Sequence, residues 1–190
     1  MAVLPIRISG DAVLHAPALP VTAFDAELHE LVANMIDTMH AAPGVGLAAP
    51  QVGVPLRLFV YEYTDSDAVV HSGAAINPVL LISPPPVADA DEDTDSEGCL
   101  SFPGERFPLV RSSDAVLRAF DVDGVAFEVE ASGWLARIFQ HEFDHLNGYL
   151  YVDRLEFPYA KAAAKISRKR SWGSPGQSWM PGVDTFEGGA

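Results

Sequence analysis

Two histidines, His141 and His145, stand four positions apart, and Glu142 directly follows the first of them. On an α-helix, positions i and i+4 lie on one face, so both imidazoles can approach a single ion. Glu142 would then lie near any water bound to that ion. The flanking residues favour a helix, because Ser132 can cap its start and Gly148 can end it. The pattern predicts a metal site on a helix; the competing interpretation is two solvated or core histidines.

A catalytic site of this kind needs a third protein ligand and an open coordination position. One known pattern continues H-x-x-G-x-x-H, but this chain has Tyr151 where that histidine would stand. Downstream glutamates are weak alternatives, because Glu156 is too near in sequence and Glu187 lies close to the C-terminus. The chain's single cysteine, Cys99, is by itself more simply explained as a small buried residue. Beside two imidazoles, however, its thiolate would suit Zn²⁺ or Fe²⁺, so we predict that it completes the site.

A hydrolase that attacks a carbonyl also needs hydrogen-bond donors for the developing oxyanion. The backbone N–H of Leu100, directly after Cys99, is the first candidate. A second is the side-chain amide of Gln51, in the small-residue segment 44–53. Nothing in the local sequence places Gln51 near Cys99, so this pairing is a hypothesis. The alternative for segment 44–53 is a structural turn, and without a lysine it is a poor phosphate binder.

Hydrophobic periodicity predicts the secondary structure on either side of these motifs. Besides the motif helix, helical spacing predicts helices at 22–40 and 159–170, the first with Thr22 and Asp25 as a capping box. Alternating or short apolar runs predict strands at 56–63, 74–82, 116–121 and 125–130. The last two are joined by a hairpin turn at Asp123-Gly124, and Pro78 predicts an edge or a bulge in the second.

Helices at both ends with strands between them predict an α+β fold. We expect one domain at residues 1–170, followed by a loose tail rich in Gly, Pro and Ser at 171–190. The segment 83–97, with three prolines and the run ADADEDTDSE, is predicted to be a loop. It is either solvated, which we favour, or shapes access to the site near Cys99.

The net charge of −14 argues against a protein whose main surface binds DNA, because such binding requires clustered Lys and Arg. One cysteine allows no intramolecular disulfide and fits a reducing compartment. The N-terminal sequence has no signal-peptide pattern, and no apolar run approaches a membrane span. We therefore expect a cytoplasmic protein.

Three separated stretches together resemble the peptide deformylase family. They are Gly44–Gln51, Glu97–Ser101 and Gln140–Gly148, in the family's order, and the EGCLS form is similar to the common bacterial class. The resemblance covers residues 5 to 160 and implies an α+β fold with small mixed or antiparallel sheets around a central metal-binding helix. It also implies an enzyme that removes the formyl group from the initiator methionine of new polypeptides and releases formate.

The resemblance implies roles for the residues of these motifs. Cys99, His141 and His145 would bind the metal, usually Fe²⁺ in the family, with Zn²⁺, Ni²⁺ or Co²⁺ able to substitute. Glu142 would act as general base and then as general acid. Gln51 and the Leu100 N–H would polarise the formyl oxygen.

The substrate implied is an N-formyl-methionyl nascent peptide. Gly46 would offer backbone contacts near the formyl group, and Gly98 would contact the peptide. Ile138, and less directly Trp134, are candidates for the apolar methionine pocket, the alternative being ordinary core. The basic helix end at 165–170 is most simply a complement to the helix dipole. Its second interpretation is a contact with the ribosome, as relatives make through a C-terminal helix.

Two rival functions are weaker. A metallopeptidase that cuts internal peptide bonds would need the missing third histidine. A non-catalytic metal-binding or ribosome-associated protein would require neither Glu142 nor Gln51, and both are present.

Overall fold

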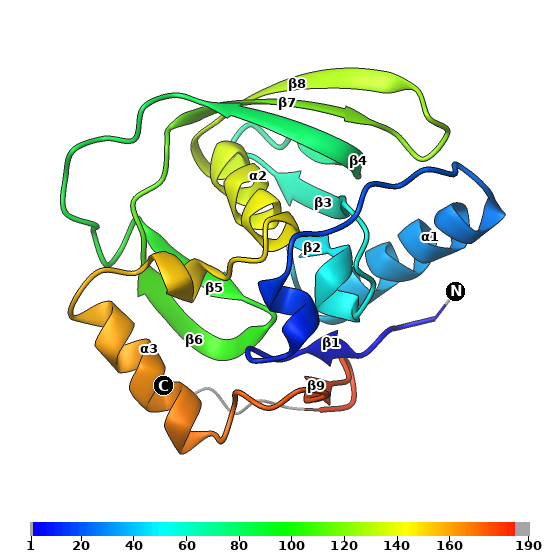
Figure 1. Cartoon of the computed structure of the whole chain (residues 1–190). Coiled ribbons are helices and arrows are strands. Elements are labelled where there is room, and N and C mark those ends of the chain that lie inside the picture. Colours follow the sequence, from blue (N-terminus) through cyan, green and yellow to red (C-terminus); the bar gives the residue numbers. More distant parts are fainter. Residues whose placement is uncertain (1, 185–190) are drawn as a thin grey trace.

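The structure is a computed structural model that describes residues 2–184. Helix α2 (Gly133–Leu146) lies at the centre, between the main sheet and a β-hairpin (Figure 1). Helix α1 (Ala26–Ala41) and helix α3 (Tyr159–Lys169) lie on opposite sides of it (Figure 1). This arrangement confirms the predicted α+β fold around a central helix. No helix among residues 2–184 is long and apolar enough to cross a membrane.

The main sheet is antiparallel and has the strand order β2-β3-β4-β7-β8. Its strands are β2 (Gly46–Ala48), β3 (Leu58–Thr64), β4 (Val70–Ile82), β7 (Asp114–Phe120) and β8 (Ala126–Ser132). The pairing of β4 with β7 shifts register between Ile76 and Val79, which confirms the bulge predicted at Pro78. A proline cannot donate a ladder hydrogen bond, and Asn77 before it has a φ of 51°.

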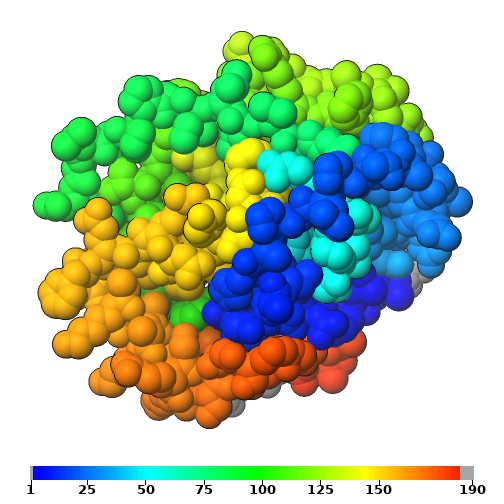
Figure 2. Space-filling model, viewed as in Figure 1, coloured from blue at the N-terminus to red at the C-terminus, as the bar shows by residue number. Residues whose placement is uncertain are grey.

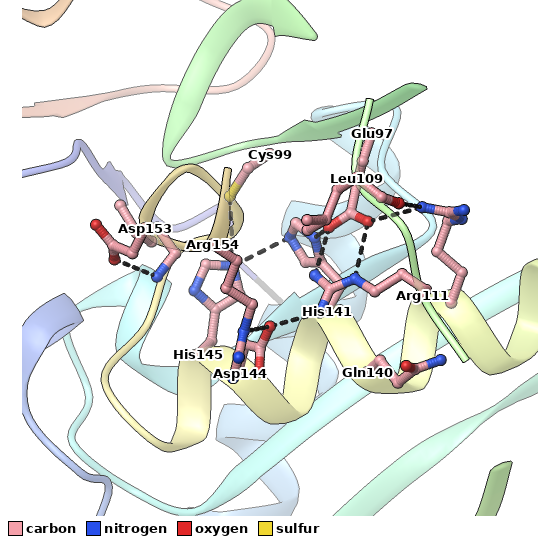
Figure 3. Close-up of polar contacts among 12 residues, drawn as sticks. Glu97, Cys99, Leu109, Arg111, Gln140, His141, Asp144, His145, Asp153 and Arg154 are labelled. Atoms are coloured by element: carbon pink, nitrogen blue, oxygen red, sulfur yellow. Dashed lines mark hydrogen bonds and ion pairs between the residues drawn. The ribbon is translucent and has the colours of Figure 1, made fainter. Parts of the chain in front are cut away.

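Helix α2 is held by its apolar face against this sheet. Phe139 is fully buried, and its ring meets that of Tyr61 edge-on at 5.0 Å between centroids. Burial of such a side chain stabilises the fold by roughly 1.5–3 kcal/mol. The sheet thus fixes the position of α2. The motif histidines lie on a different face of α2, the one toward the β-hairpin (Figure 3).

Two further sheets have two strands each. One is the hairpin of β5 (Ser96–Cys99) and β6 (Phe102–Pro108), and the other pairs β1 (Ile6–Arg7) with β9 (Ser178–Trp179). None of these four strands was predicted from the sequence. The remaining elements are 3-10 turns at Ala12–His15, Ala49–Val52 and Tyr151–Arg154.

The expectation of a loose tail after residue 170 is wrong as far as residue 184. Strand β9 pairs with β1, and the Ile8 N–H donates to the Gln177 carbonyl at 3.0 Å. Figure 2 shows the orange to red C-terminal segment lying along the blue N-terminal segment. Residues 185–190, including Glu187, lie outside the described residues. The division into a domain at 1–170 and a tail at 171–190 stays a prediction.

Several predicted boundaries also need correction. Helix α1 begins at Ala26 rather than Thr22, because the Asp25 side chain caps it by accepting from the Glu27 and Leu28 N–H groups, each at 3.1 Å. Segment 44–53 is not a plain loop, since it contains β2 and a 3-10 turn. Ser132 precedes α2 as predicted, but its side chain makes no capping hydrogen bond.

Candidate functional site

The cysteine and the two motif histidines converge in the folded chain. The Cys99 Sγ lies 3.3 Å from the His145 Nε2, which lies 3.2 Å from the His141 Nε2. The ligand atoms of these three residues all lie within 4.8 Å of one another. Tetrahedral bonds of about 2.0–2.3 Å would separate such ligand atoms by about 3.3–3.6 Å. The three residues therefore fit one metal ion, with Cys99 at the end of β5 and both histidines on α2 (Figure 3).

His141 is oriented by a buried carboxylate, Glu97. The Glu97 Oε1 lies 2.6 Å from the His141 Nδ1, which leaves the Nε2 facing Cys99 and His145. A carboxylate on the far nitrogen of a metal-binding histidine fixes its tautomer and ring orientation. Burial alone would raise the pKa of Glu97, but His141 and Arg111 hold that pKa well below its usual value. Glu97 thus stays ionised; its role beside His141 was not predicted from the sequence.

Arginines surround this carboxylate. Arg111 donates two hydrogen bonds to Glu97, at 3.1 and 2.7 Å, and a third to Asp144 at 2.6 Å (Figure 3). Arg154 binds both oxygens of Asp144 at 2.6 Å, and Arg137 binds Glu97 at 3.2 Å. The network joins β5 to both turns of α2 that carry the histidines. Glu97 and Asp144 both lie inside stretches that the sequence had singled out, and these two acidic residues were the signals that could have indicated the network.

Gln51, which the sequence could not place, lies beside Cys99. Its Nε2 is 3.6 Å from the Cys99 Sγ and donates to the Ser101 hydroxyl at 3.3 Å. Its Oε1 accepts the Ala48 N–H at 2.8 Å, and this bond fixes which end of the amide faces the site. The side chain therefore presents a donor, rather than an acceptor, toward the cysteine.

Glu142 is buried, with 3% of its surface exposed. Burial raises the pKa of Glu142 to about 7. Its Oε2 has no hydrogen-bond partner among the described residues. A Cβ atom at Gly46 would lie 2.4 Å from the Glu142 Oε1, so only glycine leaves room for this carboxyl group. A buried carboxyl group with a pKa near neutrality can both accept and return a proton.

A cavity of about 750 Å³ opens onto these groups. Every site residue predicted above contributes to its wall except His145, which is not among the described lining residues. Ile138 and Trp134 line it as well, so the residues predicted for the apolar pocket face the same cavity as Cys99 and His141.

Tyr151 and the acidic segment 83–97 both contact residues of the site. Tyr151 does not replace a third histidine; its ring stacks 6.1 Å from that of His141, and its hydroxyl donates to the Glu105 carbonyl at 3.2 Å. Of the acidic segment 83–97, only Glu97 is among the described residues that line the cavity. Asp95 instead binds Arg137 at 2.6 Å, so the end of that segment is anchored to α2.

Known proteins are similar to this chain in sequence and in fold. A sequence model of the family described as polypeptide deformylase matches residues 3–160. A peptide deformylase of Tropheryma whipplei strain TW08/27 is 52% identical over 94% of both chains. One from Rhodococcus opacus is also 52% identical, over 96% of this chain and 95% of its own. The crystal structure of a peptide deformylase from Legionella pneumophila is similar with a TM-score of 0.74 and 38% identity, over 90% of this chain and 98% of that one.

Proposed function

The chain belongs to the polypeptide deformylase family, and from this premise we propose how its residues carry out the reaction. It is a metal-dependent hydrolase that removes the N-formyl group from the initiator methionine of new polypeptides and releases formate. The observation that supports the residue assignment best is the convergence of Cys99, His141 and His145 beside the buried Glu142.

In this proposal Cys99, His141 and His145 hold one divalent ion. Fe²⁺ is the proposed physiological ion, with Zn²⁺, Ni²⁺ or Co²⁺ able to take its place, because a thiolate with two imidazoles suits borderline-soft metals. When bound, the ion supplies a Lewis acid and lowers the pKa of water toward neutrality. Glu97 and Arg111 keep the His141 ring turned toward the site.

Glu142 is the proposed general base. It accepts a proton from water as the water oxygen adds to the formyl carbon. It then delivers a proton to the amine nitrogen as the carbon–nitrogen bond breaks, which yields formate and a free amino terminus. Its burial, its unpartnered Oε2 and its raised pKa support this role.

The Gln51 Nε2–H and the Leu100 backbone N–H are the proposed donors to the formyl oxygen as negative charge develops on it. The hydrogen bond from the Ala48 N–H supports the Gln51 assignment, because it directs the amide nitrogen toward Cys99. Fixed donors of this kind stabilise the transition state without reorganising during the reaction.

The methionine side chain is proposed to enter the apolar part of the cavity beside Ile138 and Trp134. Ile138 is 4% exposed and lies on α2, one turn before Glu142, the proposed general base. The backbone groups of Gly46 and Gly98 are the proposed contacts of the formyl group and the peptide, and both residues line the same cavity.

Two finer points concern the cellular setting. The end of α3 presents Lys165, Arg168 and Lys169 as exposed residues, which supports a weak contact with ribosomal RNA there. The overall acidic charge supports neither DNA nor a membrane as a partner. A cytoplasmic location follows from this proposal, because nascent formylated peptides are its substrate.

The ligand assignment is tested by X-ray absorption on the zinc-loaded protein. We expect one sulfur neighbour at about 2.3 Å and nitrogen neighbours at about 2.0–2.1 Å. A first shell without sulfur would exclude Cys99 as a ligand, whatever the activity of the preparation.

Replacement of Gly46 by alanine tests how the glycine serves Glu142. The added methyl group would overlap the Glu142 carboxyl group and displace it. Because a displacement near 1 Å can lower a rate by about 100-fold, we expect kcat to fall by about 10- to 100-fold. Steady-state formate release measures this, and an unchanged metal content shows that the metal-binding residues remain in place. Wild-type kcat with an intact fold would contradict the close approach.

A further inference from the structure

Residues Leu100 and Ser101 form the turn between β5 and β6. The peptide group that joins them contacts the Cys99 sulfur. The Ser101 N–H donates to the Cys99 Sγ at 3.4 Å. The Leu100 carbonyl belongs to the same planar peptide unit and accepts from the Trp179 indole Nε1–H at 2.9 Å. Because the unit is rigid, the indole and the sulfur constrain the same plane from its two ends.

Trp179 is itself held in place by the N-terminal segment. It belongs to β9, and its register partner in β1 is Ile6, which is fully buried. The Ser9 N–H, just beyond β1, donates to the Ser101 carbonyl at 2.8 Å. Both terminal segments therefore reach the turn that follows Cys99, and they are joined to each other by the β1–β9 pairing (Figure 1).

We propose that Trp179 is a positioning residue for the metal centre, acting through the Leu100–Ser101 peptide group on the Cys99 sulfur. The indole N–H holds the peptide plane so that the Ser101 N–H points at the sulfur. It also polarises the peptide group, because hydrogen bonds in a chain strengthen one another. The inference rests on the proposed function in one respect, the assignment of Cys99 as a metal ligand.

The position of Trp179 supports a role for its hydrogen bond to Leu100 beyond packing. Trp179 lines the same cavity as Cys99 and Glu142. Partners of metal ligands typically change metal affinity or activity by about 10–100-fold when they are removed. In this proposal the C-terminal segment, which its composition predicts to be a loose tail, contributes to the metal centre through Trp179.

The test is Trp179→Phe in the full chain, which keeps an aromatic ring but removes the indole N–H. Trp172→Phe is the matched control, because Trp172 lies in the same C-terminal segment but packs edge-on against Phe102, with 4.9 Å between ring centroids. The readouts are the thiolate-to-metal absorption band of the Co²⁺-loaded protein, the affinity for Zn²⁺ in chelator competition, kcat, KM and the unfolding midpoint.

We expect Trp179→Phe to shift the absorption band, weaken Zn²⁺ binding by about 10-fold and lower kcat more than it raises KM. Trp172→Phe should leave the band and the affinity unchanged. If both variants lower only the unfolding midpoint, Trp179 is structural and the inference is wrong. It is also wrong if KM alone changes, since Trp179 then contacts substrate without acting on Cys99. Absence of the thiolate band in the wild-type protein would instead disprove the Cys99 assignment in the proposed function.

Discussion

Replacement of Glu142 by glutamine should lower kcat for formate release by about 10²- to 10⁴-fold, the usual contribution of a positioned general base. The amide has nearly the shape of the carboxyl group but cannot accept the proton of the attacking water. Because Glu142 is not one of the three converging ligand residues, metal content should stay at the wild-type level. Steady-state kinetics together with metal analysis of the same preparation measure both quantities.

Glu62→Gln is a suitable control, since Glu62 is half-exposed and pairs with His40 on the surface. It should leave kcat unchanged. If Glu142→Gln kept kcat within a few-fold of wild type with full metal content, the proton would have to be accepted elsewhere, and the general-base assignment would be wrong.

Replacement of Arg111 by methionine should destabilise the fold by about 3 kcal/mol, because removal of one partner from a buried ion pair leaves an uncompensated charge. Arg111 bridges Glu97 and Asp144, and all three side chains are nearly inaccessible to solvent. The estimate lies at the low end of the usual range, since Arg137 still binds Glu97 and Arg154 still binds Asp144. Urea unfolding of the metal-free protein measures the change without a contribution from metal binding.

Arg118→Met is the control for Arg111. Arg118 pairs with Glu128 on the exposed surface of the main sheet, so its loss should cost at most about 1 kcal/mol. Equal effects of the two substitutions would contradict the view that the buried arginine network holds β5 against α2.

The convergence of Cys99, His141 and His145 was largely predictable because its signals in the sequence are local. The spacing of His141 and His145 identifies one face of a helix, and the single cysteine was the remaining soft ligand. The contact of Gln51 with Cys99 could not be predicted, since the residues lie 48 positions apart and meet only through packing. The contacts of Arg111 could not be predicted either. Arg111 is an isolated charge in the sequence, 14 residues from Glu97 and 33 from Asp144, and it meets both only in the folded chain.

Secondary structure was likewise predictable only where the sequence carries a local signal. Strands β3, β7 and β8 have seven residues each, long enough for an alternating pattern to be visible. Strand β5 has four residues with the sequence SEGC, and β9 has two, so neither carries a periodic signal. The composition of the C-terminal segment favours a loose chain, but its pairing partner, β1, lies at the other end of the sequence.

The most direct test of the account is formate release from an N-formyl-methionyl peptide by protein prepared without oxygen and loaded with Fe²⁺, with the peptide product identified by mass. Deformylation would yield formate together with an otherwise intact peptide bearing a free amino terminus. A formyl peptide left unchanged by folded, metal-loaded protein would contradict the proposed function, and so would cleavage at an internal peptide bond.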